Sequence, residues 1–148
     1  MQEHKYVALL QQFCSDLGVQ DAQKMLAEGQ FQADGVDFAF VHDDMTTPNY
    51  MMIFTDFGDF PRHATASILA DLLRTNLYFY AGAGSPTFSL APDTGRVVLM
   101  STESLDELTA GKLALSVKFL AQQATEWRER AAQTAPDTQM QTHLYERG

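Results

Sequence analysis

The chain has 148 residues, 45% of them hydrophobic and 20% charged, which is typical of a folded domain rather than a disordered segment. No apolar run approaches the roughly 20 residues that a membrane span needs, so we expect no membrane insertion. A formal net charge of −9 disfavours nucleic-acid binding, which depends on Lys and Arg to neutralise phosphates.

The acidic residues are concentrated at the start of the chain. Residues 1–59 contain ten acidic residues against two lysines. This excess either keeps a small domain in solution or attracts a basic partner. The first residues lack the features of a secretory signal, and the single Cys14 cannot form an internal disulfide, so we expect a cytoplasmic protein.

The first half of the chain reads as helices followed by strands. Apolar residues at helical spacing over residues 3–17 predict a first helix, and residues 21–27 predict a shorter one. Alternation over residues 31–43 predicts one half-buried strand. Residues 50–57 are apolar on both faces and predict a second strand that needs cover on both sides.

Residues 68–100 contain a change of period that predicts a helix running into a hairpin. Helical spacing of leucines predicts a helix that begins near His63 and ends at Asn76, a residue type that tolerates the left-handed turn closing a helix. Residues 87–90 and 96–101 then alternate with period two. The Pro-Asp-x-Gly turn between them indicates an antiparallel pair.

The last predicted element is a long helix over residues 105–132, preceded by a run of capping residues over 101–104. Its main apolar seam comprises Leu113, Val117, Leu120, Ala124 and Trp127. Leu115 and Phe119 lie off that seam, so either the helix is sunk in its own core there or these two side chains meet another chain. We expect one domain over residues 1–133 and a polar, flexible tail over residues 134–148.

No motif in the sequence supports an active site. Asp56-Phe-Gly58 lacks every other kinase motif, Gly82-Ala-Gly84 lacks the lysine of a phosphate loop, and His42 and Asp43 are neighbours that diverge on a strand. We therefore predict no catalytic residue, no metal site, no cofactor and no enzymatic activity.

The chain has instead a surplus of apolar side chains, with ten phenylalanines, five tyrosines and seven methionines. A two-layer domain of this size covers only one face of its sheet. The apolar side chains that the domain cannot bury by itself predict a dimer, a bound polypeptide, or both. Two alternatives are a small α+β ligand-binding domain or enzyme with an apolar pocket, and a dimerisation module that binds no other protein.

The order of elements resembles that of the class I type III secretion chaperones, the Tir-chaperone/YopE-chaperone family. The resemblance covers residues 5–130 and rests mainly on residues 69–76, 87–100 and 113–127. It implies an α+β fold of order α-β-β-(β)-α-β-β-α, an antiparallel twisted sheet packed with three helices in a homodimer. Such chaperones usually have three strands before the middle helix, whereas only two are evident here, because residues 57–61 leave little room for a third.

The resemblance also implies function. The chain would bind the N-terminal region of a secreted effector in extended form and keep it soluble and competent for secretion. The implied partner-binding residues are Leu9, Phe13, Leu17, Phe38, Phe40, Met52 and Phe54. The implied dimer-interface residues are Leu69, Leu72, Leu73, Asn76 and Phe88.

Overall fold

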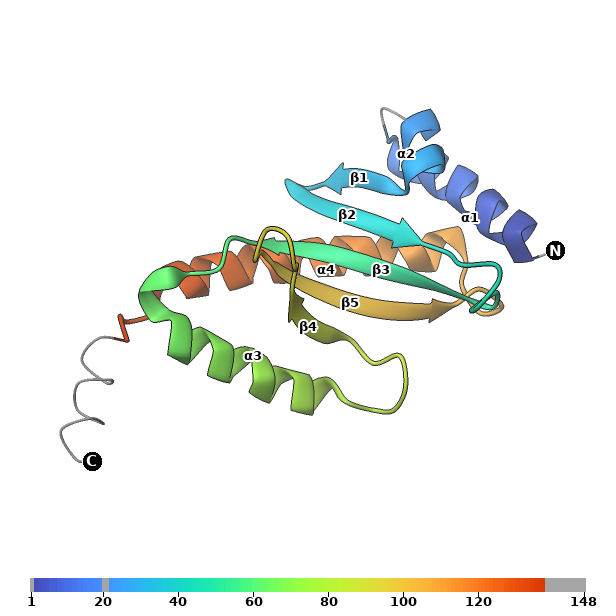
Figure 1. The fold of residues 1–148 in the computed structure, drawn as a ribbon. Helices are drawn as coiled ribbons and strands as arrows, with labels where there is room; N and C mark the ends of the chain where they lie inside the picture. The colour runs from blue at the N-terminus through green and yellow to red at the C-terminus, as the bar shows by residue number, and fades with distance from the viewer. Residues whose placement is uncertain (1, 20–21, 138–148) are drawn as a thin grey trace.

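The computed structural model describes residues 2–19 and 22–137. Their strands form one antiparallel sheet in the order β1-β2-β3-β5-β4 (Figure 1), which confirms the predicted α+β class. The elements in chain order are α1 Gln2–Leu17, α2 Ala22–Glu28, β1 Gln30–Ala33, β2 Val36–Val41, β3 Tyr50–Gly58, the 3-10 turn η1 Arg62–Ala64, α3 Thr65–Phe79, β4 Thr87–Leu90, β5 Val97–Ser104 and α4 Ala110–Gln133.

The core lies between one face of the sheet and the helices α1 and α4. Alternation along β2 sends Val36, Phe38 and Phe40 into this core, where each is almost fully buried. Helix α4 runs behind the sheet in Figure 1, and α3 lies beside β4. Among the described elements no helix crosses the front face of the sheet in that view. No helix of the described residues is long and apolar enough to span a membrane.

The single strand predicted over residues 31–43 is wrong, because this segment is a hairpin. Asp34 and Gly35 both have positive φ, 51° and 76°, as a two-residue hairpin turn requires. Strand β1 then pairs with β2, with Phe31 opposite Phe38. Three strands therefore precede the middle helix, because the first predicted strand is two, and no further strand lies between β3 and α3.

Helix α3 does not end at Asn76, as the leucine pattern predicted, but continues to Phe79. The side chain of Asn76 is engaged by the edge strand β4 instead of closing the helix. Its Nδ2 donates to the carbonyl oxygen of Phe88 at 3.2 Å, and the Phe88 N–H donates to its Oδ1 at 2.6 Å. A tertiary contact has thus replaced the expected cap.

Helix α4 begins at Ala110, five residues later than predicted, with the hydroxyl of Thr109 accepting from the Lys112 N–H at 3.1 Å. Residues 101–104, expected to cap the helix, belong to β5. The predicted seam of α4 is buried throughout. Leu115 and Phe119 are 68% and 61% exposed, so the alternative in which the helix is sunk around them is wrong for the single chain.

Residues 134–137 leave the end of α4 and return to the start of α3. The carboxylate of Asp137 is 7% exposed and accepts from the Ser67 N–H and hydroxyl. The predicted tail therefore includes two residues, Thr134 and Asp137, that are bonded to the domain. The rest of it, residues 138–148, lies outside the described residues.

Candidate partner-binding surface

Helix α3 covers part of one edge of the sheet. Strand β4 is the edge strand on this side, and Phe88 faces Leu99 of β5. The backbone N–H and C=O of Phe88 point away from β5 and are both satisfied by the side chain of Asn76. At Phe88 this edge therefore has no free backbone group for another strand.

The opposite edge, strand β1, is open. The tight turn makes Ala33 and Val36 a bonded pair, and the Phe40 N–H donates to the Gly29 carbonyl at 2.7 Å at the other end. Along an antiparallel pair, residues whose backbone groups bond to the partner strand alternate with residues whose backbone groups point outward. Gln30 and Gln32 therefore present their N–H and C=O groups along the free edge.

A groove of about 1210 Å³ runs along this open edge. On the side of the helices its wall includes Leu17, Val19 and Phe31. On the other side it includes Ala39 and Phe54, which come from the sheet face that no helix covers. The groove therefore offers an apolar surface on both sides of the plane in which an added strand would lie.

The uncovered sheet face continues this apolar surface across the strands. Phe54 pairs with Ala39 on one side and with Met100 on the other, and Met52 pairs with Val41. Val41 is exposed and the others are only partly buried. Apolar side chains left partly accessible on one contiguous face are typical of a protein-binding surface.

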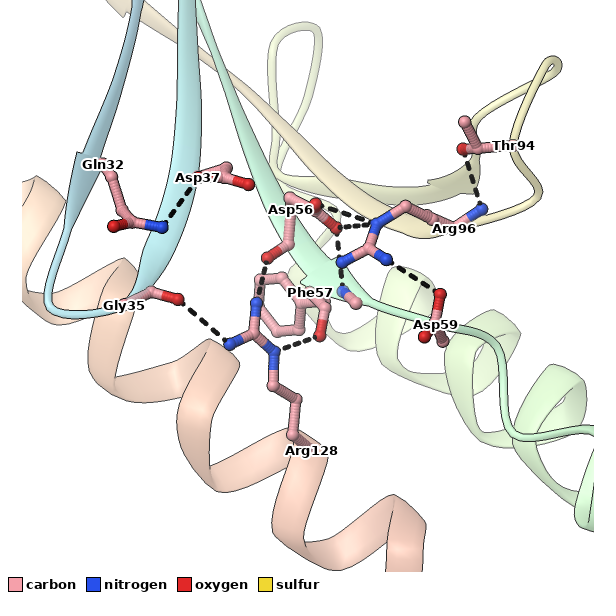
Figure 2. Close-up of polar contacts among 10 residues, drawn as sticks. Gln32, Gly35, Asp37, Asp56, Phe57, Asp59, Thr94, Arg96 and Arg128 are labelled. Atoms are coloured by element: carbon pink, nitrogen blue, oxygen red, sulfur yellow. Dashed lines mark hydrogen bonds and ion pairs between the residues drawn. The ribbon is translucent and has the colours of Figure 1, made fainter.

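An acidic cluster with one arginine lies at the end of the groove (Figure 2). The Arg96 Nε donates to Asp56 at 2.9 Å and 3.1 Å, and its Nη1 donates to Asp59 at 2.8 Å. The hydrogen bond to Asp56 is the main cause that raises the pKa of Arg96. Asp37 neighbours Asp56 across β2 and β3 and accepts from the Gln32 amide at 3.2 Å. Three carboxylates thus gather near the Arg96 guanidinium at this end of the groove.

Arg128 of α4 fixes the position of the strands beneath the cluster. Its Nε donates to the Phe57 carbonyl at 2.7 Å, its Nη2 to the Asp56 carbonyl at 2.9 Å and its Nη1 to the Gly35 carbonyl at 3.4 Å (Figure 2). One side chain thus holds the end of β3 and the turn of the first hairpin against the last helix. Sequence reasoning missed Arg128, because its acceptors are backbone groups far away in the chain.

A second exposed apolar surface lies on α3. Leu73 and Leu77 are 69% and 73% exposed, and Leu69 is partly exposed on the same side. Ile68 and Leu72 point the other way and are buried. The helix therefore has one face in the core of the chain and one apolar face turned away from it.

The structure divides the predicted partner-binding residues into two groups. Leu9, Leu17, Met52 and Phe54 are partly accessible, and the groove includes Leu17 and Phe54. The other three, Phe13, Phe38 and Phe40, are buried in the core.

The predicted dimer residues also differ in exposure. Leu69 and Leu73 are exposed, Leu72 is buried, and Asn76 and Phe88 are half-buried and bonded to each other. Leu77, which follows on the same exposed face, was missing from the prediction. The helical spacing of the leucines could have included it.

Side chains capable of chemistry do not converge in the described parts of the chain. No group of three His, Cys, Asp or Glu side chains there could hold a metal ion. Burial raises the pKa of the Cys14 thiol, which disfavours a reactive thiolate, and raises the pKa of Tyr6 to about 12. His42 stacks on Tyr6 and is 2.9 Å from the Pro48 carbonyl, a structural arrangement.

Known proteins share this fold and this sequence pattern. Residues 8–128 match the family model of the Tir chaperone protein (CesT) family. The chain is similar in structure to the Yersinia pestis type III secretion chaperone SycH, solved with a stable fragment of YscM2, at 24% identity and a TM-score of 0.58 over 82% of this chain and 98% of that one.

Two further solved structures are similar. One is from the ExsC–ExsE complex, at 17% identity and a TM-score of 0.66 over 85% of this chain and 92% of that one. The other is from the HopA1–SchA chaperone–effector complex, at 19% identity and a TM-score of 0.60 over 84% and 94%. No curated protein matches the chain significantly. By its match over most of its length, the chain belongs to the Tir chaperone protein (CesT) family.

Proposed function

We propose that this chaperone holds the N-terminal region of its effector in extended form, as an additional strand along β1, in the bacterial cytoplasm. The observation that carries this proposal is the open edge of the sheet at β1 with an apolar surface on each side of it. A segment kept there cannot collapse or aggregate before secretion.

The geometry of a strand explains why both surfaces are needed. Successive side chains of a strand point to opposite faces. An effector strand beside β1 would bond to the outward backbone groups of Gln30 and Gln32. Its side chains would then alternate between the wall that contains Leu17 and the wall that contains Phe54. Backbone bonds would supply affinity, and the two walls would select alternating apolar side chains.

The similar structures support a polypeptide partner. The SycH structure contains a fragment of YscM2, and the HopA1–SchA structure is described as a chaperone–effector complex. Both likenesses cover most of either chain. A polypeptide in extended form also suits an open groove better than a small molecule does, because a small-molecule site encloses its ligand.

We further propose that two copies associate through α3. Leu69, Leu73 and Leu77 form an apolar face that the described part of the chain leaves exposed. Burying such a face against its copy gives a symmetric contact in which the same residues serve both subunits. The homodimer would carry an open β1 edge in each copy.

The test is co-expression with the reading frame next to the chaperone gene, followed by purification and limited proteolysis. We expect a stoichiometric complex in which roughly 50–100 N-terminal residues of the partner resist protease. A dimer that retains no partner would contradict effector binding.

A pair of substitutions then locates the contact. Gln32→Pro removes one outward N–H from β1, while Gln32→Ala keeps it, and both lose the amide bond to Asp37. We expect Gln32→Pro to weaken effector retention at least about tenfold relative to Gln32→Ala. Equal retention by the two variants would place the effector elsewhere.

A further inference from the structure

Helix α3 begins without a cap of its own. Its N-cap residue is Ala64, which has no side-chain hydrogen-bonding group, and its first turn contains no acidic residue. The first N–H groups of a helix have no partner within it, and they usually bond to a Ser, Thr, Asp or Asn just before it. Something else must satisfy the start of α3.

Asp137 supplies that cap from the other end of the chain. Its Oδ2 accepts from the Ala66 N–H, and its Oδ1 accepts from the Ser67 N–H at 3.2 Å and from the Ser67 hydroxyl at 2.9 Å. A carboxylate at this place also interacts favourably with the positive end of the helix dipole. The pattern is that of an N-cap, although the capping residue lies 70 positions after Ser67.

Two more hydrogen bonds hold residues 134–137 against the turn before α3. The Asp137 N–H donates to the His63 carbonyl at 3.1 Å, and the His63 ring nitrogen Nε2 lies 2.9 Å from the Thr134 carbonyl oxygen. Thr134 itself is bonded to the last turn of α4, since its N–H donates to Ala131. Residues 134–137 therefore join the end of α4 directly to the start of α3.

Helix α3 depends on contacts near its two ends. Towards its end it packs on β4, where Asn76 bonds to Phe88. At its start, residues 134–137 are the segment that bonds to its first turn. One apolar face, with Leu73 at its centre, points away from the rest of the chain. Loss of the bonds at the start would loosen the first turn of the helix, which lies directly before Leu69.

We propose that residues 134–137 are a strap that fixes the start of α3 against the end of α4, with Asp137 as its anchor. The strap sets the angle at which α3 presents its exposed leucines, and so links the association surface to α4, which packs beneath the groove-forming sheet. Asp137 is thus a positioning residue for self-association. This consequence rests on the homodimer proposed above, whereas the strap itself does not.

Hydrogen exchange tests the strap directly. We expect Asp137→Ala to accelerate amide exchange at Ala66 and Ser67 roughly five- to tenfold, the effect of losing one N-cap, while amides of β3 and β5 stay protected. Asp137→Asn keeps an acceptor and should restore most of the protection. Glu129→Ala, an exposed change of equal charge on α4, should leave exchange at these two amides unchanged.

Sedimentation of the same variants tests the consequence. We expect Asp137→Ala and a chain ending at residue 133 to raise the dimer dissociation constant about five- to tenfold, while a chain ending at residue 137 matches the full chain. Unchanged exchange at Ala66 and Ser67 overturns the strap. Faster exchange with an unchanged dissociation constant overturns its role in self-association. A full chain that stays monomeric contradicts the proposed homodimer instead. In that case hydrogen exchange at Ala66 and Ser67 is the test of the strap.

Discussion

The side-chain amide of Asn76 bonds to both the N–H and the C=O of Phe88, as the backbone of a neighbouring strand would. A helix side chain thus stands in for a missing strand beside β4. The amide suits this role because it carries a donor and an acceptor on one planar group. The contact covers part of one edge of the sheet and attaches the end of α3 in the same place.

We predict that Asn76→Ala lowers the free energy of unfolding by about 1–3 kcal/mol, because it leaves two half-buried backbone groups of Phe88 without a partner. Chemical denaturation measures the change. Asn76→Asp should cost a similar amount, since a carboxylate accepts from the Phe88 N–H but repels its carbonyl oxygen.

Arg74→Ala is the control on the same helix. Its ion pair to Asp71 is long, 3.4 Å, and exposed, so its loss should cost no more than about 0.5 kcal/mol. A loss at Arg74 as large as that at Asn76 would mean that helix α3 itself, rather than the bridge to β4, limits stability.

Arg128→Lys should destabilise the chain by about 1–3 kcal/mol, although it preserves the charge. A lysine cannot reach the carbonyls of Asp56 and Phe57 with the two parallel bonds that the guanidinium makes. Thermal unfolding compares it with Arg130→Lys, an exposed change two residues away that should be nearly neutral. Equal melting temperatures would show that the two bonds contribute nothing net.

Gly29→Ala should destabilise the chain by more than about 2 kcal/mol. Gly29 has φ of 72°, and a Cβ there would collide with the Phe40 carbonyl oxygen, which is backbone and cannot move aside. Gly18→Ala is the matched control, with φ of 64° and open space around it. It should cost only the strain of positive φ, about 1–2 kcal/mol. The difference in unfolding free energy between the two variants, measured by chemical denaturation, gives the cost of the collision between residue 29 and the Phe40 carbonyl oxygen.

Leu73→Glu should convert the proposed homodimer into a monomer with little loss of the chain's own stability, because Leu73 is exposed and glutamate is a good helix former. Leu72→Ala should do the reverse and cost about 2–5 kcal/mol of stability, since Leu72 is buried. Light scattering and denaturation on both variants separate association from folding. A dimeric Leu73→Glu variant would exclude this face of α3 from the contact.

The contribution of Asp137 should depend on pH. Burial alone would raise its pKa, but the hydrogen bonds from Ala66 and Ser67 outweigh burial and hold it below the ordinary value. A lowered pKa in the folded state stabilises the fold above the ordinary pKa of about 4, and this stabilisation disappears as the pH falls through the folded value. The unfolding free energy of the wild type minus that of Asp137→Asn should therefore be constant from pH 5 to 8 and shrink below about pH 4.

Periodicity predicted most of the fold, because the long elements bury one clear face. The leucines of α3 and the seam of α4 are examples, with Leu113 and Val117 fully buried as expected. Strand β1 escaped notice because it is four residues long and two of them are glutamines. The Asp34-Gly35 pair was the available signal, since that dipeptide favours the tight hairpin turn.

Tertiary contacts explain what local sequence could not give. Asn76 was predicted to end a helix, yet β4 engages its side chain and the helix continues. Phe13 and Phe40 were expected to contact an effector, but they contact each other, with ring centroids 5.4 Å apart in the core. Composition cannot separate a core phenylalanine from one in a binding groove, because both require an apolar side chain at the same spacing.

The contact of Asn76 with β4 also limits how copies of this chain can pair through the edges of their sheets. Growth of a fibril by strand pairing requires two free edges on every molecule, one for each neighbour. A copy whose β4 edge is blocked at Phe88 can pair through β1 with one other copy, and that pair then has no free β1 edge for a third copy. Copies of this chain therefore cannot join edge to edge into a growing sheet.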